Sequence, residues 1–317
     1  MLQTHQPGFY QDALQRTTTF DEIHKLDQFL AAWGGLGKAL EGLQGRLERG
    51  APARTDDAAL RERIGQLAVE LDQLCFVAVS KNARDLGDGL ICLSLVERTG
   101  QTQDGIQKLV GMYQSLGRRR RLTVEVLGEF CEGKQDFAYL QITGLGGFSL
   151  LKHESGLHQL DRKFKAKSPR TGREVIHEDR EVIRVEVLPL DGEPEKSFRQ
   201  AVKPKFATLK PVRQRLLKAD LLVSLFHEAK LRSLTFWTSG PRSEALERGL
   251  LILHSQLSGE AARPETRSDA IIRHYELGLS ARIKDARTGR STTSVERVLK
   301  GHLDSLLLDP QAGVNAG

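Results

Sequence analysis

The stretch from Arg162 to Arg173 holds the residues of this sequence best suited to binding chemistry. It carries six Lys and Arg residues and no acid, with Phe164 as its one aromatic residue. Polar loops with clustered positive charge rarely pack inside a protein, whereas they are well placed to contact phosphates. Lysines without a stacking partner grip phosphate rather than read bases, and Phe164 is interpreted as a hydrophobic anchor for the base of the loop. The predicted contacts here are Arg162, Lys163, Lys165, Lys167, Ser168, Pro169, Arg170, Thr171, Arg173 and His177.

Further clusters of positive charge lie elsewhere in the chain. Four consecutive arginines, Arg118 to Arg121, are typical of a solvated surface and equally of a phosphate contact, and the sequence does not separate these interpretations. Residues 196–218 contain eight Lys or Arg and no acid, and the C-terminal segment adds a smaller basic group. The candidate RNA contacts in these clusters are Arg118, Arg119, Arg120, Arg121, Lys203, Lys205, Lys210, Arg282, Lys284 and Arg287.

The overall composition is that of a globular protein with a basic excess. At 317 residues the chain exceeds one ordinary core, so two to four structural units are expected. The net charge of +6 is clustered, which favours nucleic acid over an anionic membrane as partner, because the sequence shows no amphipathic basic helix, lipidation signal or spanning apolar run. Three separated cysteines in apolar surroundings predict reduced core residues, and we expect a cytoplasmic monomer without metal or cofactor.

Two long helices are predicted near the N-terminus. Apolar residues over 23–47 recur at steps of three or four, which indicates one apolar stripe along a helix. Thr19 and Glu22 form a candidate capping box at its start. After a break at 49–57 the same spacing resumes over 60–74, which predicts an antiparallel, partly coiled-coil-like hairpin.

Strands and one helix are predicted around the basic loop. A strand with aromatic and β-branched residues over 137–143 leads toward the loop, and an alternating strand over 182–188 is expected to return beside it. A change from helical to extended period at residue 88 marks the start of this α/β unit. The remaining expected elements are strands over 90–96 and 122–127 and a helix over 102–116 with Gly117 as its C-cap.

The C-terminal part predicts a small basic module and a closing segment. The module follows a linker around Pro194, and the closing segment starts after a polar link around Pro264. The module is expected to contain strands over 220–225 and 231–237 and a helix that opens at Pro241 and reaches about residue 257. The closing segment is expected to contain residues 271–284 and a helix from Ser294 to Leu308 with Thr293 and Glu296 as its capping box.

Several local motifs stand at spacings known from one protein family. They are a Pro-Gly-Phe-Tyr element at 7–10, a helix and V-E-V-L strand over 104–127, and a strand followed by a Gly-Leu-His-Gln-Leu-Asp-Arg element over 139–162. The most specific matches are Arg282-Ile283-Lys284-Asp285, Arg287-Thr288-Gly289, Val298-Leu299, Gly301 and Leu303-Asp304. In these motifs the chain resembles the bacterial peptide chain release factors over nearly its whole length, closest to the type that reads UGA and UAA.

The resemblance implies an α+β multidomain fold. It would comprise an N-terminal helical hairpin domain (1–86), an α/β sandwich like the codon-recognition domain (87–192), an inserted small α/β module in place of the catalytic domain (193–262), and a C-terminal segment that completes the second domain (263–317). The resemblance also implies a place of work, the ribosomal A site. Its neighbours there would be rRNA and mRNA, with a P-site tRNA as a further candidate.

The sequence lacks the Gly-Gly-Gln motif with which release factors hydrolyse the peptidyl-tRNA ester. Neither Gly-Gly pair, at 34–35 or 146–147, is followed by glutamine, and residues 198–218 contain no glycine. In the family the two glycines give the loop conformations closed to other residues. His227 and Glu228 are a candidate substitute, but surface residues at a strand end are the stronger interpretation. We therefore predict that ester hydrolysis is lost.

The codon-reading region also departs from the family. The reading tripeptide Ser-Pro-Phe is matched only by Ser168-Pro169-Arg170, four residues later after His158 than the family spacing requires. The His-Thr pair expected after Arg173 is replaced by Glu-Val-Ile-His. Residues 97–102 retain one glycine of a Gly-Ala-Gly-Gly-Thr-Glu segment, so a different turn is expected there. Stop-codon reading through base edges is not expected.

These observations lead to one expectation and two alternatives. We expect a release-factor-like protein that binds the ribosomal A site without hydrolysing peptidyl-tRNA and acts in translation control, ribosome protection or rescue. One alternative is a release factor that retains peptidyl-tRNA hydrolysis through a divergent site within 196–258. The other is an RNA-binding protein that acts away from the ribosome.

Overall fold

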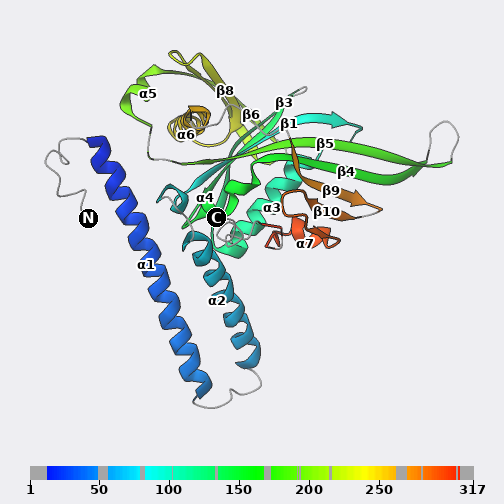
Figure 1. Cartoon of the computed structure of the whole chain (residues 1–317). Coiled ribbons are helices and arrows are strands. Elements are labelled where there is room, and N and C mark those ends of the chain that lie inside the picture. The colour runs from blue at the N-terminus through cyan, green and yellow to red at the C-terminus, as the bar shows by residue number, and fades with distance from the viewer. Residues whose placement is uncertain are drawn as a thin grey trace.

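The chain consists of a helical hairpin attached to a body built on one large sheet (Figure 1). Within the described residues no helix has both the length and the apolar character needed to cross a bilayer. All three cysteines are free thiols. The computed structural model describes residues 13–48, 56–78, 83–101, 103–132, 135–167, 173–190, 192, 194–213, 216–261, 270–279, 281–304 and 306–307.

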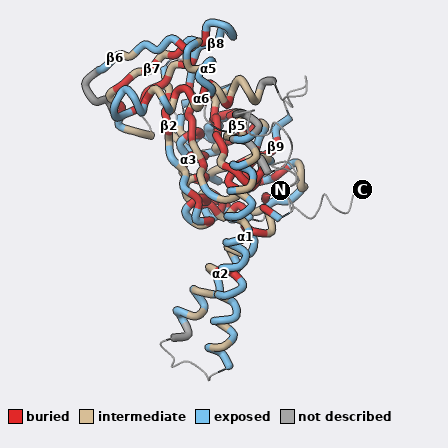
Figure 2. The backbone as a smooth tube through the Cα atoms, turned by 90° about the vertical axis from the view of Figure 1, so that its left-hand side faces the viewer, coloured by how far each residue is buried: buried red, intermediate tan, exposed pale blue. Residues whose placement is uncertain are grey.

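The helices α1 (Ala13–Glu48) and α2 (Asp56–Ala78) form the predicted hairpin and extend away from the body (Figure 1). Leu145 of the body packs against the hairpin where the two meet. Much of the apolar stripe on α1 faces solvent, and Leu30 is 64% exposed. Figure 2 shows this contrast, with buried positions concentrated in the body. The buried core of the hairpin consists of Leu36, Leu67 and Leu74.

Eleven strands of the described chain form one sheet in the order β11-β10-β9-β4-β5-β1-β3-β2-β8-β7-β6. Only β4 and β9 pair in parallel, and the other recorded pairs are antiparallel. The strands are β1 Gly89–Thr99, β2 Thr123–Glu132, β3 Gln135–Thr143, β4 Gly156–Lys167, β5 Glu174–Pro189, β6 Val202–Arg213, β7 Lys218–His227, β8 Arg232–Thr238, β9 Ile271–Gly278, β10 Arg282–Asp285 and β11 Ser291–Thr292. The shorter helical segments are η2 Ala83–Leu86, α4 Gly147–Leu151, η3 Lys152–Glu154, α5 Lys196–Ala201 and α7 Val295–Leu299.

Two apolar clusters lie on opposite faces of the central strands. Because side chains alternate along a strand, Ile91 points toward helix α3 (Gly105–Arg120), whereas Leu90 points toward helix α6 (Arg242–Ala261). The side chains of Leu90 and Ile91 are both fully buried, and each burial stabilises the fold by about 1.5–3 kcal/mol. The C-terminal segment joins the α3 cluster through Leu303.

The module predicted over 193–262 is continuous with the rest of the body. Its strand β8 pairs with β2 at Trp237 and Glu129. The Glu129 carboxylate also accepts the backbone N–H groups of Leu216 and Leu217, both at 2.9 Å. The cluster around α6 draws residues from both parts. The four predicted domain ranges remain predictions, because these contacts describe packing rather than boundaries.

Two predictions near the basic loop are wrong. Strand β5 does not return beside β3, since β1 lies between them, with Leu90 opposite both Leu188 of β5 and Gln141 of β3. Alternation shows which face of a strand is buried but does not identify the partner strand. Residues 162–167 of the predicted loop are strand, because their lysines alternate with Phe164 and Ala166 at a period of two.

Predictions of helix ends and of one edge strand also differ from the structure. Helix α1 begins before Thr19, so the predicted capping box lies inside the helix. Helix α3 continues through Gly117 and ends at Arg120, and its C-cap Arg121 takes the left-handed conformation at φ 55°. The closing helix is only α7, with Ser294 as its N-cap and no side-chain cap bond. Strand β6 was not predicted because Pro204 interrupts it, yet a proline is tolerated on an edge strand.

Candidate nucleic-acid interface

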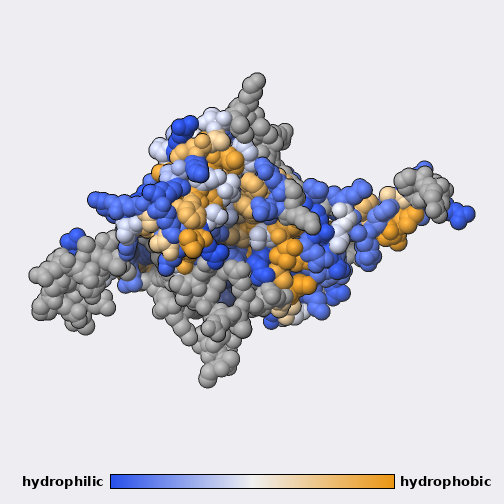
Figure 3. All heavy atoms as spheres, turned by 90° about the horizontal axis from the view of Figure 1, so that it is seen from above, coloured by the Kyte–Doolittle hydropathy of each residue, from blue (hydrophilic) through white to orange (hydrophobic). Residues whose placement is uncertain are grey.

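The outer parts of β4 and β5 form a two-stranded arm that projects from the body (Figure 1). The arm comprises residues 162–167 and 173–180. Its pairing is unbroken from Arg162 opposite Asp179 to Lys167 opposite Glu174. Seen from above, the arm extends well beyond the compact part of the molecule (Figure 3). It therefore presents its side chains to a partner at a distance from the body.

Cross-strand register sorts the side chains of the arm onto two faces. Lys163, Lys165 and Lys167 share one face, which we call the lysine face. The return strand places Glu178 and Glu174 on the same face, directly opposite Lys163 and Lys167. Three lysines against these two glutamates leave one net positive charge. The basic run contains no acid within its own stretch of sequence, because the acids that lie opposite its lysines belong to strand β5.

Two of the three lysines are ion-paired. Lys163 Nζ lies 2.7 Å from Glu178 Oε1, and Lys165 Nζ lies 3.7 Å from Glu174 Oε2. The hydrogen bond to Glu178 raises the pKa of Lys163 above its usual value. All four side chains are more than half exposed, so these pairs contribute little to folding stability. Their consequence is that the carboxylates compete with phosphate for the lysines.

The outer end of the arm retains uncompensated positive charge. Lys167 and Arg173 are exposed, and neither forms an ion pair with another residue of the described ranges. Lys167 is the last residue of β4, and Arg173 immediately precedes β5. The predicted contacts Ser168, Pro169, Arg170 and Thr171, and the side chain of Lys210, lie outside the described residues.

The opposite face of the arm carries an aromatic pair. The rings of Phe164 and His177 stack at a centroid distance of 5.6 Å and an interplanar angle of 18°. Val175 lies on this face next to them and is 45% exposed, and Ile176 on the lysine face is 57% exposed. Figure 3 shows apolar surface near the outer end of the arm. Phe164 is half-buried and His177 is exposed, and accessible rings on a basic element are suited to stacking with unpaired bases.

A group of charges on the aromatic side fixes the base of the arm. Arg162 Nη2 donates to both oxygens of Asp104, at 3.1 and 2.9 Å. Burial would raise the pKa of Asp104, but hydrogen bonds from Lys108 and Arg162 outweigh it and lower that pKa. Gly100, at φ 87°, lies against Asp179, and a Cβ there would overlap that carboxylate. Arg162 therefore positions the arm, which accounts for its charge without RNA.

The lysine face continues onto β9 and β10. Lys284 is opposite His274 and Arg282 is opposite Glu276, and Glu276 is in turn opposite Asp161 on β4. Arg282 and Lys284 are exposed. His274 Nε2 lies 2.7 Å from Asp161 Oδ2. The structure thus brings together, on one face, basic residues that are more than a hundred positions apart in the sequence.

Three of the four consecutive arginines form contacts between different elements of the protein. Arg119 donates to Gly301 O at 2.6 Å and to the Asp304 carboxylate at 3.1 Å. Arg120 is only 5% exposed and also pairs with Asp304. Arg121 pairs with Glu70 of α2. These three therefore join α3 to the hairpin and to the C-terminal segment, whereas the exposed Arg118 bonds to Ser115 within α3.

Arg287 belongs to a buried charge network. Its Nη2 lies 2.7 Å from Asp285 Oδ2 and 3.3 Å from Glu154 Oε1. Fully buried Arg273 bridges the same two carboxylates, at 2.5 Å to Glu154 and 2.9 Å to Asp285. Burial lowers the pKa of neighbouring His158 to about 4, and the Arg273 charge adds to this shift. The ion pairs around Asp285 thus join the C-terminal segment to the body, and the Arg287 side chain takes part in them.

The remaining predicted contacts lie on the module. Lys203 and Lys205 project from the edge strand β6, and Lys203 Nζ lies 3.8 Å from Glu228 Oε2. His227 is 5% exposed, and its Nδ1 accepts the Lys230 N–H at 3.2 Å. His227 and Glu228 thus face different partners, which removes the geometric basis for a catalytic pair between them.

Comparison with known proteins bears on the fold. No protein-family model matches the chain. Among solved structures, the chain is similar to RF2 of Thermus thermophilus, with a TM-score of 0.58 over 97% of this chain and 91% of that chain. The two sequences are 21% identical, so the likeness concerns the fold. This protein therefore has a release-factor-like fold.

Proposed function

We propose that this protein binds the ribosomal A site in the manner of a release factor and does not hydrolyse peptidyl-tRNA. One observation carries the proposal: a release-factor-like fold that extends over 97% of the chain contains no Gly-Gly-Gln. Such a protein would act in translation control, ribosome protection or rescue, as a cytoplasmic monomer. Its partners would be rRNA and mRNA, with a P-site tRNA next to the module.

The shape and charge of the arm support contact with RNA. The arm is narrow, projects from the body, and carries Lys167 and Arg173 at its outer end (Figure 1). Cations at exposed positions bind phosphates through charge and counterion release, which requires no base sequence. The Phe164–His177 pair adds a surface on which a base can stack. We propose that the arm enters the decoding region and grips RNA there without reading a stop codon.

The β6–β7 hairpin supports the loss of hydrolysis. In the release-factor resemblance this module takes the place of the catalytic domain, whose loop needs two adjacent glycines. Strands β6 and β7 pair from Val202 opposite His227 to Arg213 opposite Lys218, and residues 198–218 contain no glycine. Without glycine, this hairpin lacks the residues whose backbone freedom the family's loop uses to position water at an ester.

Two assays on purified ribosomes test the proposal. Co-sedimentation through sucrose should show saturable binding that weakens as salt rises. A peptide-release assay with a stop codon in the A site should show release no faster than the spontaneous rate. Failure to bind ribosomes would refute the proposal, and recovery of a transcript without rRNA would favour an RNA-binding role away from the ribosome. Release above background would establish a divergent hydrolytic site.

A matched variant distinguishes two reasons for inactivity. Either the Gly-Gly-Gln residues are absent, or the module lies away from the ester. Insertion of Gly-Gly-Gln between Gln214 and Arg215 would restore the residues without changing the rest of the hairpin. If this variant releases peptide while the natural sequence does not, the module reaches the peptidyl-transferase centre and lacks only its chemistry. If the inserted variant binds ribosomes but stays inactive, the module does not present this connection to the ester.

A further inference from the structure

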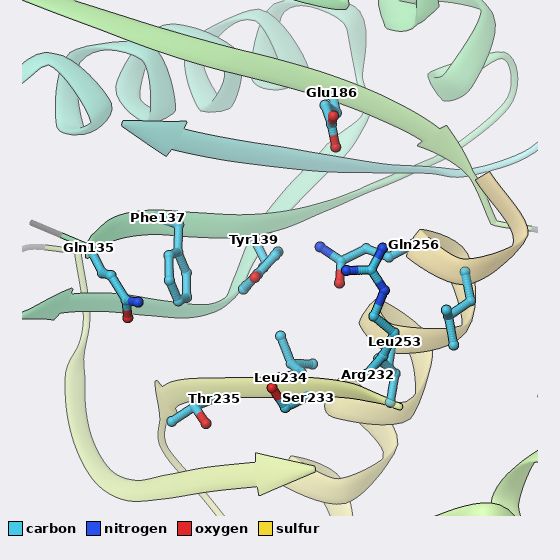
Figure 4. Close-up of a pocket in the computed structure, with 11 residues that line it drawn as sticks. Gln135, Phe137, Tyr139, Glu186, Arg232, Ser233, Leu234, Thr235, Leu253 and Gln256 are labelled. Carbon is cyan, nitrogen blue, oxygen red and sulfur yellow. The ribbon is translucent and has the colours of Figure 1, made fainter. Parts of the chain in front are cut away.

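A cavity of about 370 Å³ lies between β3, β8 and α6, away from the arm (Figure 4). Pockets that bind small ligands start at about 300 Å³, so this cavity suits a small molecule. It lies where the module packs on the central strands. Its lining residues are Gln135, Phe137, Tyr139, Glu186, Arg232, Ser233, Leu234, Thr235, Leu253, Gln256 and Leu257.

The cavity exists because two neighbouring strands separate. Strand β8 pairs with β7 along its whole length, from Arg232 to Thr238. On its other edge it pairs with β2 only at Trp237, opposite Glu129. Within the described residues no strand pairs with the rest of this edge. Backbone N–H and C=O groups of β8 therefore border the cavity without a partner strand, and such groups favour a ligand that offers both acceptors and donors.

The lining of the cavity is mainly polar, and two aromatic rings form part of one wall. Phe137 and Tyr139 project into it from β3, with ring centroids 5.5 Å apart (Figure 4). Phe130 stacks on Phe137 at 5.2 Å and 13°, which holds that ring in place. Leu234 of β8 and Leu253 of α6 line the cavity from the module side. A flat ligand would lie against aromatic rings and be covered by leucines.

The polar groups stand around the edges of the cavity. Gln135 lies at one end and Gln256 at the other, and each amide can both donate and accept a hydrogen bond (Figure 4). Burial raises the pKa of Tyr139, so its hydroxyl stays protonated beside Gln256. Glu186 and Arg232 contribute opposite charges to the lining. Their charges offset each other, so the site favours a neutral ligand over an ion.

We propose that this cavity binds a nucleobase. A neutral, planar heterocycle with donors and acceptors around its rim matches aromatic walls, amide edges and an unpaired strand edge. An apolar ligand would not match the mainly polar lining, and residues of α6 line the side of the cavity where a further strand would have to lie. The base can come from a free nucleoside or from an unpaired residue of RNA, and both present the same chemistry. The site goes beyond ribosome binding, because it is complete in the free protein.

Titration of the free full-length protein tests the proposal. The probes are adenosine, guanosine, cytidine, uridine and, as a control without a base, ribose, followed by an unstructured RNA tetranucleotide. At least one nucleoside should bind saturably while ribose does not. Tighter binding of the tetranucleotide, displaced by the nucleoside, would indicate RNA as the source of the base, and equal or weaker binding would indicate a free nucleoside.

Variants locate the binding. Phe137→Leu removes a stacking ring and should weaken nucleoside affinity at least about five-fold. Gln135→Ala removes an exposed amide and should weaken it about two- to twelve-fold. Gln141→Ala, on the same face of β3 but outside the cavity, should bind as the natural protein does. Absence of saturable binding by every probe, or equal affinity in all three variants at unchanged melting temperature, would overturn the proposal.

Discussion

The ion pairs on the arm predict that removing acids will strengthen RNA binding. Glu178 is ion-paired with Lys163, and Glu174 is ion-paired with Lys165. Two of the three lysines on the lysine face can therefore bind phosphate only when these ion pairs break. In the double variant Glu174→Gln/Glu178→Gln both ion pairs are removed, while the length of the side chains and one acceptor oxygen on each are kept. We expect this variant to bind ribosomes more tightly and with a steeper salt dependence.

The size of the effect follows from the number of lysines freed. Each phosphate contact contributes about 0.7–0.9 to the slope of log affinity against log salt concentration. Two freed lysines would therefore steepen the slope by about 1.4–1.8 and raise affinity at 0.1 M salt by at most about 25- to 60-fold. The 2.7 Å pair at Lys163 should account for more of this gain than the 3.7 Å pair at Lys165.

Ribosome co-sedimentation from about 50 to about 200 mM salt measures both quantities. The matched control is Glu22→Gln/Glu41→Gln, which removes the same charge from exposed positions on α1. Both variants should elute and melt as the natural protein does, because exposed ion pairs add little stability. The reasoning is refuted if the arm variant shows no gain in affinity, or if the α1 control shows an equal one.

Four further predictions address the arm, the buried network and the contact of Gly301 with α3. Phe164→Ala removes the half-buried ring that stacks on His177 and should weaken ribosome binding by about 1–3 kcal/mol at every salt concentration, so a changed salt slope would contradict a stacking role. Glu154→Gln removes one of the two carboxylates that Arg273 bridges and should lower the free energy of unfolding in urea by about 3–5 kcal/mol, whereas a loss below about 1 kcal/mol would show that the network is dispensable. Because His158 has a pKa of about 4 when folded and about 6.5 when unfolded, the unfolded chain takes up the proton first. The free energy of unfolding should then fall as pH decreases from about 6.5 to about 4, and His158→Gln should lack this decline. Gly301→Ala places a Cβ at φ 86° against the backbone of Leu116 and should destabilise the protein by at least about 1–3 kcal/mol in thermal melts, with an unchanged melting temperature as the contrary result.

Elements with strong periodicity could be predicted from the sequence. The apolar strand at 90–96 and the helix after residue 102 both exist, because burial on a packed core imposes a clear period on their residues. Periodicity did not identify the strand that pairs with β5, because strand pairing depends on long-range contacts. It also failed for β6, whose proline is tolerated only because the strand lies at the sheet edge.

The candidate interface was only partly predictable for a related reason. The run from Arg162 to Lys167 was recognised by its charge, but Glu174 and Glu178 neutralise part of it through cross-strand pairing. A charge count along one stretch does not include the strand that returns beside it. Likewise, Arg120 and Arg287 gave no sign in sequence that carboxylates far along the chain would engage them. His274, which shares the lysine face, had no signal in the sequence beyond being a histidine near a basic motif.

Competition between this protein and tRNA shows whether the protein binds the ribosomal A site. Ribosomes with a P-site tRNA and either a vacant or a tRNA-filled A site would be titrated with the protein at fixed salt. The account predicts tight, saturable binding to the vacant ribosome and loss of that binding when the A site is filled. Equal affinity for both ribosomes would contradict it, because a release-factor-like body of this size cannot share the A site with a tRNA.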